Sequence, residues 1–299
     1  MSAAFCANII FGFTFIFTKQ ILNAGMAPFA LLSWRMLIAT LVMAALAACG
    51  VFKLRFRGKK LWRLLPVGLA SPCLYFVCET YGISKTTASE SGTIIAFIPI
   101  LVLILTRLVF KERHTPGQFV GVPLSVAGII LVVLAGGFSA NFSQSGYLLL
   151  FGAVSLAALY NIGVRWLSDE YNSAEITFSI NLLGLVFFTA LAVGQGLMEG
   201  NLKEMLLLPL QNQTVLINVL LLAISASLGA YMLVVFAIGA IGPTRSSSFA
   251  GITTMTSIIF GLVLLGEHML PLQIVGAALI IAGVWSTNHF VRHPGSGKS

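Results

Sequence analysis

Long, uninterrupted runs of apolar residues alternate along the chain with short segments that are rich in charged and turn-forming residues. A helix rises about 1.5 Å per residue, so it needs about 20 apolar residues to cross the roughly 30 Å of bilayer hydrocarbon. The runs are continuous and do not alternate between apolar and polar, which favours helices over the strands of a barrel. The pattern predicts ten membrane-spanning helices, near residues 3–22, 28–50, 62–81, 86–110, 116–136, 146–167, 174–197, 214–239, 243–265 and 271–291.

The composition leads to the same class of protein. Of the 299 residues, 58% are hydrophobic and 9% are charged, and the mean hydropathy is +0.98. A soluble domain carries about 25% charged residues because its surface faces water. Most of the surface of this chain must therefore face lipid. The first apolar run lacks a basic start and a small-residue cleavage site, so we interpret it as a retained span and not as a signal peptide.

The formal net charge of +8 gathers on one side of the predicted spans. With the N-terminus in the cytoplasm, the basic segment "KLRFRGKKLWR" (53–63) lies inside, whereas Lys85 and Lys203 lie outside. Further basic residues also fall inside: Arg107, Lys111, Arg113, Arg165, Arg245, Arg292 and Lys298. Because basic residues stay on the cytoplasmic side, we expect both termini in the cytoplasm and the chain in the cytoplasmic (inner) membrane. The charge then requires no nucleic-acid partner.

Two segments of 18 residues are similar to each other. "ERHTPGQFVGVPLSVAGI" begins at Glu112 and "EHMLPLQIVGAALIIAGV" begins at Glu267, at an offset of 155, and eight of the eighteen positions are identical. A second offset of 146 aligns Lys19 with Arg165. The chain therefore divides into a five-helix repeat over 1–138, a second over 139–291 and a flexible tail over 292–299. Because five is odd, the second repeat is inverted in the membrane, as in secondary transporters.

Four motifs stand in the apolar runs: "FGFTFIFTK" ending at Lys19, "WRMLIA" with Arg35, "YGISKTTAS" with Pro99 beyond it, and the doubled "E…P…Q..G" segment. Together they resemble the EamA family of the drug/metabolite transporter superfamily. Two features depart from the family pattern: Phe11 stands where a tryptophan is common, and Asn181 stands where the first half has Arg35. The resemblance implies ten helices in two layers around a central cavity and the carriage of small metabolites, often the export of amino acids or drugs.

The resemblance also implies that the fifth and tenth spans pack as a scaffold and do not line the transport path. The glycines agree with this role, because Gly121 and Gly128, and likewise Gly276 and Gly283, are seven residues apart on one helix face. Small residues allow helices to approach closely in lipid.

Glu112 and Glu267 open the two similar segments. Pro116 and Pro271 follow each of them by four residues, as expected within a first helical turn. We interpret both glutamates as helix-start residues. Contact of these carboxylates with the substrate is the alternative.

Four charged residues are predicted inside the membrane at one depth, towards the outer mouth: Lys19, Arg35, Glu79 and Glu90. Each such residue costs about 2.5–3.5 kcal/mol on insertion scales, so each needs a reason. One interpretation is a charge-neutral structural cluster. The other is that some of these groups contact the substrate or carry a coupling proton.

The inner mouth differs, because Arg165 and Arg245 lie there without matching acids. A helix start beside Pro243, with the hydroxyls of Ser246 and Ser247, can attract an anionic group such as a carboxylate. The alternative is that the arginines reach towards the lipid headgroups.

Polar residues deep in the first, third, fourth, sixth, eighth and ninth spans predict a neutral, partly aromatic cavity between them. The candidate substrate-binding residues are Asn8, Thr14, Tyr75, Glu79, Tyr81, Ser89, Glu90, Thr93, Tyr160, Asn161, Tyr231, Arg245 and Ser246.

We therefore expect a secondary transporter, not an enzyme, that moves a small organic metabolite by alternating access. Amino acids or related amphipathic solutes come first, with export the expected direction. A membrane-embedded enzyme acting on lipid and a channel are the alternatives. No metal or cofactor is expected. The terminal "GKS" lacks the spacing and the preceding strand of a phosphate loop, so ATP hydrolysis by the chain itself is not expected. The expected partners are the transported solute and membrane lipid. We expect a monomer, and transport coupled to protons is one option.

Overall fold

The computed structural model describes residues 1–110, 116–136, 143–247 and 249–289, and every regular element in these ranges is a helix. Within these ranges, eight helical stretches are long and apolar enough to cross a membrane. Four of them are single continuous helices: α1 (Ser2–Asn23), α2 (Pro28–Ala48), α8 (Gln144–Leu167) and α9 (Ser173–Glu199). Each matches one of the apolar runs predicted from the sequence.

The other four stretches are interrupted, whereas the sequence pattern predicted continuous helices. The stretch 61–85 holds a 3-10 turn (Leu61–Arg63), α3 (Leu64–Gly68), a π-helical segment (Leu69–Leu74) and α4 (Tyr75–Lys85). The stretch 213–241 holds α11 (Gln213–Leu221), a second π-helical segment (Leu222–Ala230) and α12 (Tyr231–Ile241). The remaining two are α5 (Ala88–Ile95) with α6 (Ile98–Phe110), and α13 (Pro243–Ser247) with α14 (Ala250–Leu264).

Proline accounts for two of these interruptions. Ser71 has extended backbone angles (φ −148°, ψ 126°) immediately before Pro72, whose nitrogen cannot donate a helical hydrogen bond. Pro99 is the second residue of α6, a position where proline suits a helix start better than a helix interior. Apolar runs report where a chain crosses the membrane but not whether the backbone hydrogen bonds continue through it.

One helix was absent from the sequence prediction. The stretch between α9 and α11, predicted as a connection, forms α10 (Leu202–Gln211). Trp34 of α2 donates its indole N–H to the carbonyl oxygen of Leu206 at 2.9 Å. The run "LLLP" is too short to cross a membrane, so the search for long apolar segments did not find it.

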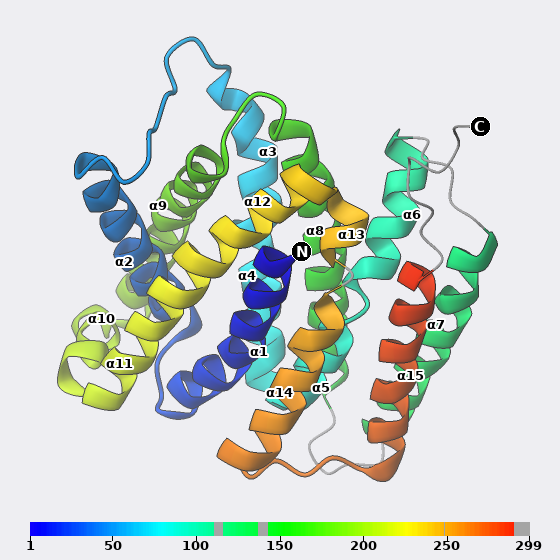
Figure 1. The fold of residues 1–299 in the computed structure, drawn as a ribbon. Helices are drawn as coiled ribbons and strands as arrows, with labels where there is room; N and C mark the ends of the chain where they lie inside the picture. The colour runs from blue at the N-terminus through cyan, green and yellow to red at the C-terminus, as the bar shows by residue number, and fades with distance from the viewer. Residues whose placement is uncertain (111–115, 137–142, 248, 290–299) are drawn as a thin grey trace.

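Helices α7 (Pro116–Gly136) and α15 (Pro271–His289) pack against each other at one edge of the molecule (Figure 1). A Cβ atom added to Gly128 would lie 2.5 Å from the carbonyl oxygen of Gly276, and one added to Gly276 would lie 2.7 Å from that of Gly128. A Cβ on Gly283 would lie 2.6 Å from the carbonyl oxygen of Gly121. The predicted use of these glycines for close helix packing is confirmed.

Gly276→Leu is expected to destabilise the folded protein by about 3 kcal/mol, because the new side chain meets backbone atoms that cannot rotate away. Gly194→Leu is the matched control, since Gly194 also lies within a helix but a Cβ there has nothing within 4 Å. The midpoint of thermal unfolding in detergent measures both. Equal midpoints for the two variants would contradict the proposed packing.

The connections define two ends of the bundle. The end that carries the basic segment 53–63 and the connection 168–172 lies at the top of Figure 1 and is called the basic end. Helix α10 and the connection 265–270 lie at the other end, called the opposite end. At the basic end, Lys59 pairs with Glu175 and Arg63 pairs with Glu170.

Candidate functional site

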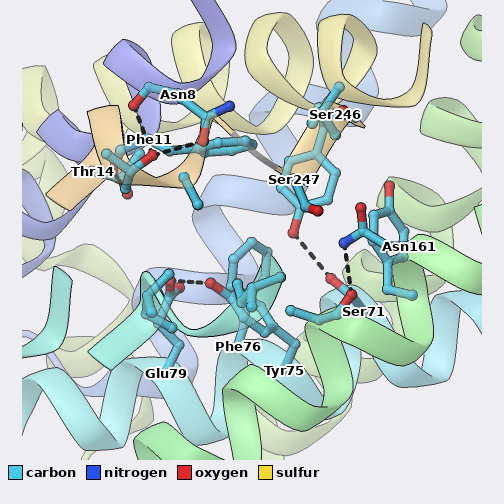
Figure 2. A pocket seen from close by; sticks show the side chains of 18 of the residues that line it. Asn8, Phe11, Thr14, Ser71, Tyr75, Phe76, Glu79, Asn161, Ser246 and Ser247 are labelled. Atoms are coloured by element: carbon cyan, nitrogen blue, oxygen red, sulfur yellow. Dashed lines mark hydrogen bonds between the residues drawn. The ribbon is translucent and has the colours of Figure 1, made fainter. Parts of the chain in front are cut away.

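A central cavity lies where the interrupted stretches meet α1, α2 and α8 (Figure 2). The cavity has a volume of about 100 Å³. Its lining residues are Asn8, Phe11, Thr14, Phe15, Arg35, Ser71, Tyr75, Phe76, Glu79, Ile95, Ile98, Ala157, Tyr160, Asn161, Tyr231, Val234, Ser246, Ser247, Ala250 and Thr253.

The cavity holds one buried cation. Arg35 is 3% exposed, its Nε donates to Ser227 Oγ at 2.6 Å, and its guanidinium carbon lies 4.3 Å from the centroid of the Phe76 ring. Among the described residues, no carboxylate oxygen lies within 4.0 Å of its nitrogens, and its two terminal nitrogens have no hydrogen bond. A buried charge is stable only with a partner. The part of the cavity beside Arg35 therefore suits an anionic group.

Glu79 is the buried acid of the same cavity. It is 6% exposed, and the hydroxyl of Tyr75, one turn earlier on the same helix, donates to its Oε1 at 2.5 Å. Arg35 and Glu79 therefore face one space without forming a direct ion pair. Such an arrangement suits a zwitterion, with each of its charges near the opposite charge of the protein.

Aromatic rings form a wall of the cavity around Tyr231. The rings of Phe11, Phe76 and Tyr160 lie 5.6, 5.9 and 5.9 Å from its ring, centroid to centroid, in edge-to-face arrangements. The hydroxyl of Tyr231 lies 3.0 Å from Ser71 Oγ, which fixes the ring. This wall can hold the flat or apolar body of a solute.

A second polar region lies away from the charged pair. Figure 2 shows Ser246 and Glu79 on opposite sides of the space. The hydroxyls of Tyr160 and Ser246 are buried and have no hydrogen-bond partner in the described ranges. Buried polar atoms are nearly always hydrogen-bonded. These two oxygens can therefore contact water or the polar, uncharged end of a solute.

The structure brings eight of the thirteen predicted substrate-binding residues to this cavity: Asn8, Thr14, Tyr75, Glu79, Tyr160, Asn161, Tyr231 and Ser246. The other five lie outside its lining: Tyr81, Ser89, Glu90, Thr93 and Arg245. Tyr81 packs edge-to-face on Phe29, and Thr93 bonds back to the carbonyl oxygen of Ser89 in its own helix. Spacing along a span predicts depth, but the helix face decides which residues reach the cavity.

Sequence reasoning missed Ser71 and the phenylalanines of the wall. Ser71 reaches the cavity because the helix is interrupted there, and the dipeptide Ser71–Pro72 is a signal that could have indicated it. Phe11 and Phe76 gave no signal, because phenylalanine is equally common on surfaces that face lipid.

The four predicted intramembrane charges separate into two places. Arg35 and Glu79 line the cavity, whereas Lys19 and Glu90 lie at the connection between α4 and α5. Glu90 closes a capping box with Thr87 at the start of α5 and accepts from Tyr147 Oη at 2.8 Å and Gln273 Nε2 at 2.7 Å. The signature Thr-x-x-Glu at 87–90 is visible in the sequence.

Glu267 does not lie at the start of its own helix, so that interpretation was wrong. Helix α15 begins at Pro271, and the carboxylate of Glu267 instead accepts hydrogen bonds from the backbone N–H groups of Ala88 and Ser89, at 2.7 and 3.0 Å. It thus caps α5, which is 178–179 residues away in the sequence. Glu112, the other predicted helix-start residue, lies outside the described residues.

Helices long enough to cross a membrane surround a cavity that joins a buried cation, a buried acid and an aromatic wall, which defines a multi-pass membrane protein with an internal polar cavity. The chain belongs to the EamA-like transporter family, whose profile matches residues 1–134 and again 144–288. It is therefore a multi-pass membrane protein of a transporter family.

Comparisons with individual proteins agree with this family assignment. The chain is 29% identical over 287 residues to the uncharacterized transporter YcxC of Bacillus subtilis, covering 96% of this chain and 91% of that one. It is 26% identical over 259 residues to a probable terminal-alkyne amino-acid exporter of Streptantibioticus cattleyicolor, covering 86% and 83%. A solved structure described as "Crystal structure of protein" shares the fold, with a TM-score of 0.66 at 17% identity and coverage of 96% and 95%.

Proposed function

We propose that the protein is a secondary transporter that moves a small zwitterionic solute, with amino acids first, out of the cell by alternating access. The observation that carries this proposal is Arg35, a buried cation that faces the cavity without a direct carboxylate partner in the described residues. In the proposed binding pose, the carboxylate of the solute contacts the terminal nitrogens of Arg35. Its ammonium group lies nearer Glu79, and its apolar body lies against the ring of Tyr231.

The proposed architecture is two inverted five-helix repeats, 1–138 and 139–291, with 292–299 as a tail. Three observations support it. The family profile matches the chain twice. The π-helical segments begin at Leu69 and Leu222, 153 residues apart. Helices α5 and α13 begin at Ala88 and Pro243, 155 residues apart, which is the offset of the sequence repeat.

Counter-flow in proteoliposomes tests the function. Vesicles loaded with one unlabelled amino acid at a time are expected to accumulate the labelled form of a substrate, while the matching amine without the carboxylate fails to drive accumulation. Flux without saturation or counter-flow would indicate a channel. Chemical change in the lipid without movement of any solute would indicate the enzyme. A pH gradient across the same vesicles distinguishes proton-coupled from facilitated transport.

We propose that the protein is a monomer in the inner membrane and that both of its termini lie in the cytoplasm. Single cysteines replacing Ser143 and Gln213 are expected to react with an impermeant maleimide in intact cells, and a cysteine replacing Gly58 is not. As a control, each of the three cysteine variants is also labelled after the membrane is permeabilised. Labelling of Gly58→Cys in intact cells would show that the orientation is the reverse of the one proposed, because Gly58 lies within the basic segment 53–63.

A further inference from the structure

The short connection between α4 and α5 is held by charged side chains from distant parts of the chain. Helix α4 ends at Lys85 and α5 begins at Ala88, so the last carbonyl groups of one and the first N–H groups of the other lack helical partners. Lys19 of α1 donates from Nζ to the carbonyl oxygens of Ile83 and Thr86, at 2.8 and 2.5 Å. A cation at the end of a helix is also favoured by the helix dipole.

Glu267 satisfies the other side of the same connection. Besides the two backbone groups of α5, it accepts from Ser89 Oγ at 2.7 Å. Its carboxylate fits against α14 because Gly261 leaves space: a Cβ there would lie 2.7 Å from Glu267 Oε2. Lys19 and Glu267 thus make charge-assisted hydrogen bonds on both sides of one turn, which are stronger than neutral ones.

This turn adjoins the cavity. Phe15, one helical turn before Lys19, lines the cavity and belongs to the same buried cluster as Ile83 and Ala88. The turn between α4 and α5 therefore packs beside the Phe15 part of the cavity, towards the opposite end of the bundle. Movement of this turn away from Lys19 would loosen the packing over that part.

The second half of the chain has the same elements without the same contacts. At the repeat offset of 155, the carbonyl groups of Ile83 and Ser84 correspond to those of Ile238 and Gly239, and α12 likewise ends just before α13. Arg165 is the counterpart of Lys19. In the described part of the chain, Arg165 forms an ion pair with Asp169 at 3.9 Å and no hydrogen bond to those carbonyls, and its side chain is 43% exposed.

We propose that Lys19 and Glu267 form a latch that closes the cavity at the opposite end, and that Arg165 closes the basic end in the other half of the transport cycle. This inference rests on the proposed function. The structure then corresponds to the state in which the first latch is made and the second is released. The two latches exclude each other, so weakening one shifts the population towards the state that the other holds.

Thiol labelling from one side tests the latch without any substrate. The four free cysteines, Cys6, Cys49, Cys73 and Cys78, are first replaced by serine, and Thr14→Cys places one thiol in the cavity. An impermeant maleimide is added on the side of the opposite end in oriented vesicles. Lys19→Met is expected to raise the labelling rate by about tenfold or more, since it removes hydrogen bonds made by a charged group and the loss of one such bond already shifts the equilibrium by about that factor.

Lys85→Met is the matched control, because Lys85 lies on the same connection but bonds the exposed Ser145 Oγ. It is expected to leave the rate unchanged, Glu267→Gln to raise it, and Arg165→Gln to lower it. Should Lys19→Met fail to fold, Ser89→Ala removes one hydrogen bond to the charged carboxylate of Glu267 and carries the test, with a rise of about tenfold expected.

Equal labelling of Lys19→Met and Lys85→Met, or of Ser89→Ala and the unsubstituted protein where that variant carries the test, would overturn the latch. The outcome separates from that of the proposed function. Counter-flow with unmoved labelling rejects the latch alone, and shifted labelling with no transported amino acid rejects the substrate class alone.

Discussion

Transport by Arg35→Gln is expected to fall about 100-fold at subsaturating solute. Truncating one partner of a buried, hydrogen-bonded charge pair costs about 2–5 kcal/mol, and a 100-fold loss corresponds to about 2.7 kcal/mol. Arg35→Lys is expected to recover part of the rate, because the charge remains while the fork that can bind a carboxylate with two parallel bonds is lost. The initial rate of counter-flow, normalised to folded protein, measures both variants.

The same substitution removes the nearby cation from buried Glu79, so folding needs its own control. The double change Arg35→Gln with Glu79→Gln is expected to restore the yield of folded protein without restoring transport. If the double variant transports at the original rate and affinity, the pair is structural and the solute binds elsewhere in the cavity. Glu79→Gln alone separates the roles further, because a functional acid changes affinity or pH dependence while folding survives.

Local patterns allowed much of the fold to be predicted. The continuous spans follow from apolar runs of sufficient length, because crossing the hydrocarbon imposes one requirement on every residue of the run. The capping boxes at Thr87–Glu90 and Asn172–Glu175 are also readable, since both partners lie within one turn. Interruptions were harder, because Pro72 indicates a break but the second π-helical segment (222–230) contains no proline.

The site could be predicted only in part, because its decisive contacts join distant segments. The bond from Arg35 to Ser227 spans 192 residues, and the cap from Glu267 to Ala88 spans 179. Neither follows from the spacing along one helix. The sequence placed Lys19, Arg35 and the two acids at one depth, yet their partners depend on the rotation of each helix and on where the helices break.

Glu175→Ala is expected to destabilise the protein by about 3 kcal/mol. The Glu175 side chain is fully buried and accepts hydrogen bonds from Lys59 Nζ and from the backbone N–H groups of Arg55 and Asn172, at 2.5, 2.8 and 2.9 Å. Removing it leaves those donors without their acceptor, and breaking a buried pair costs about 3–5 kcal/mol. We expect the lower end of this range because the Lys59 side chain is 23% exposed and can be hydrated.

Glu170→Ala is the matched control at the same end of the molecule. Glu170 accepts from Arg63 at 2.7 Å, but both side chains are about one third exposed, at 29% and 32%. Ion pairs that water can reach contribute about 1 kcal/mol or less. The midpoint of thermal unfolding in detergent should therefore fall much more for Glu175→Ala than for Glu170→Ala. Equal shifts would mean that Glu175 does not hold the basic segment 53–63.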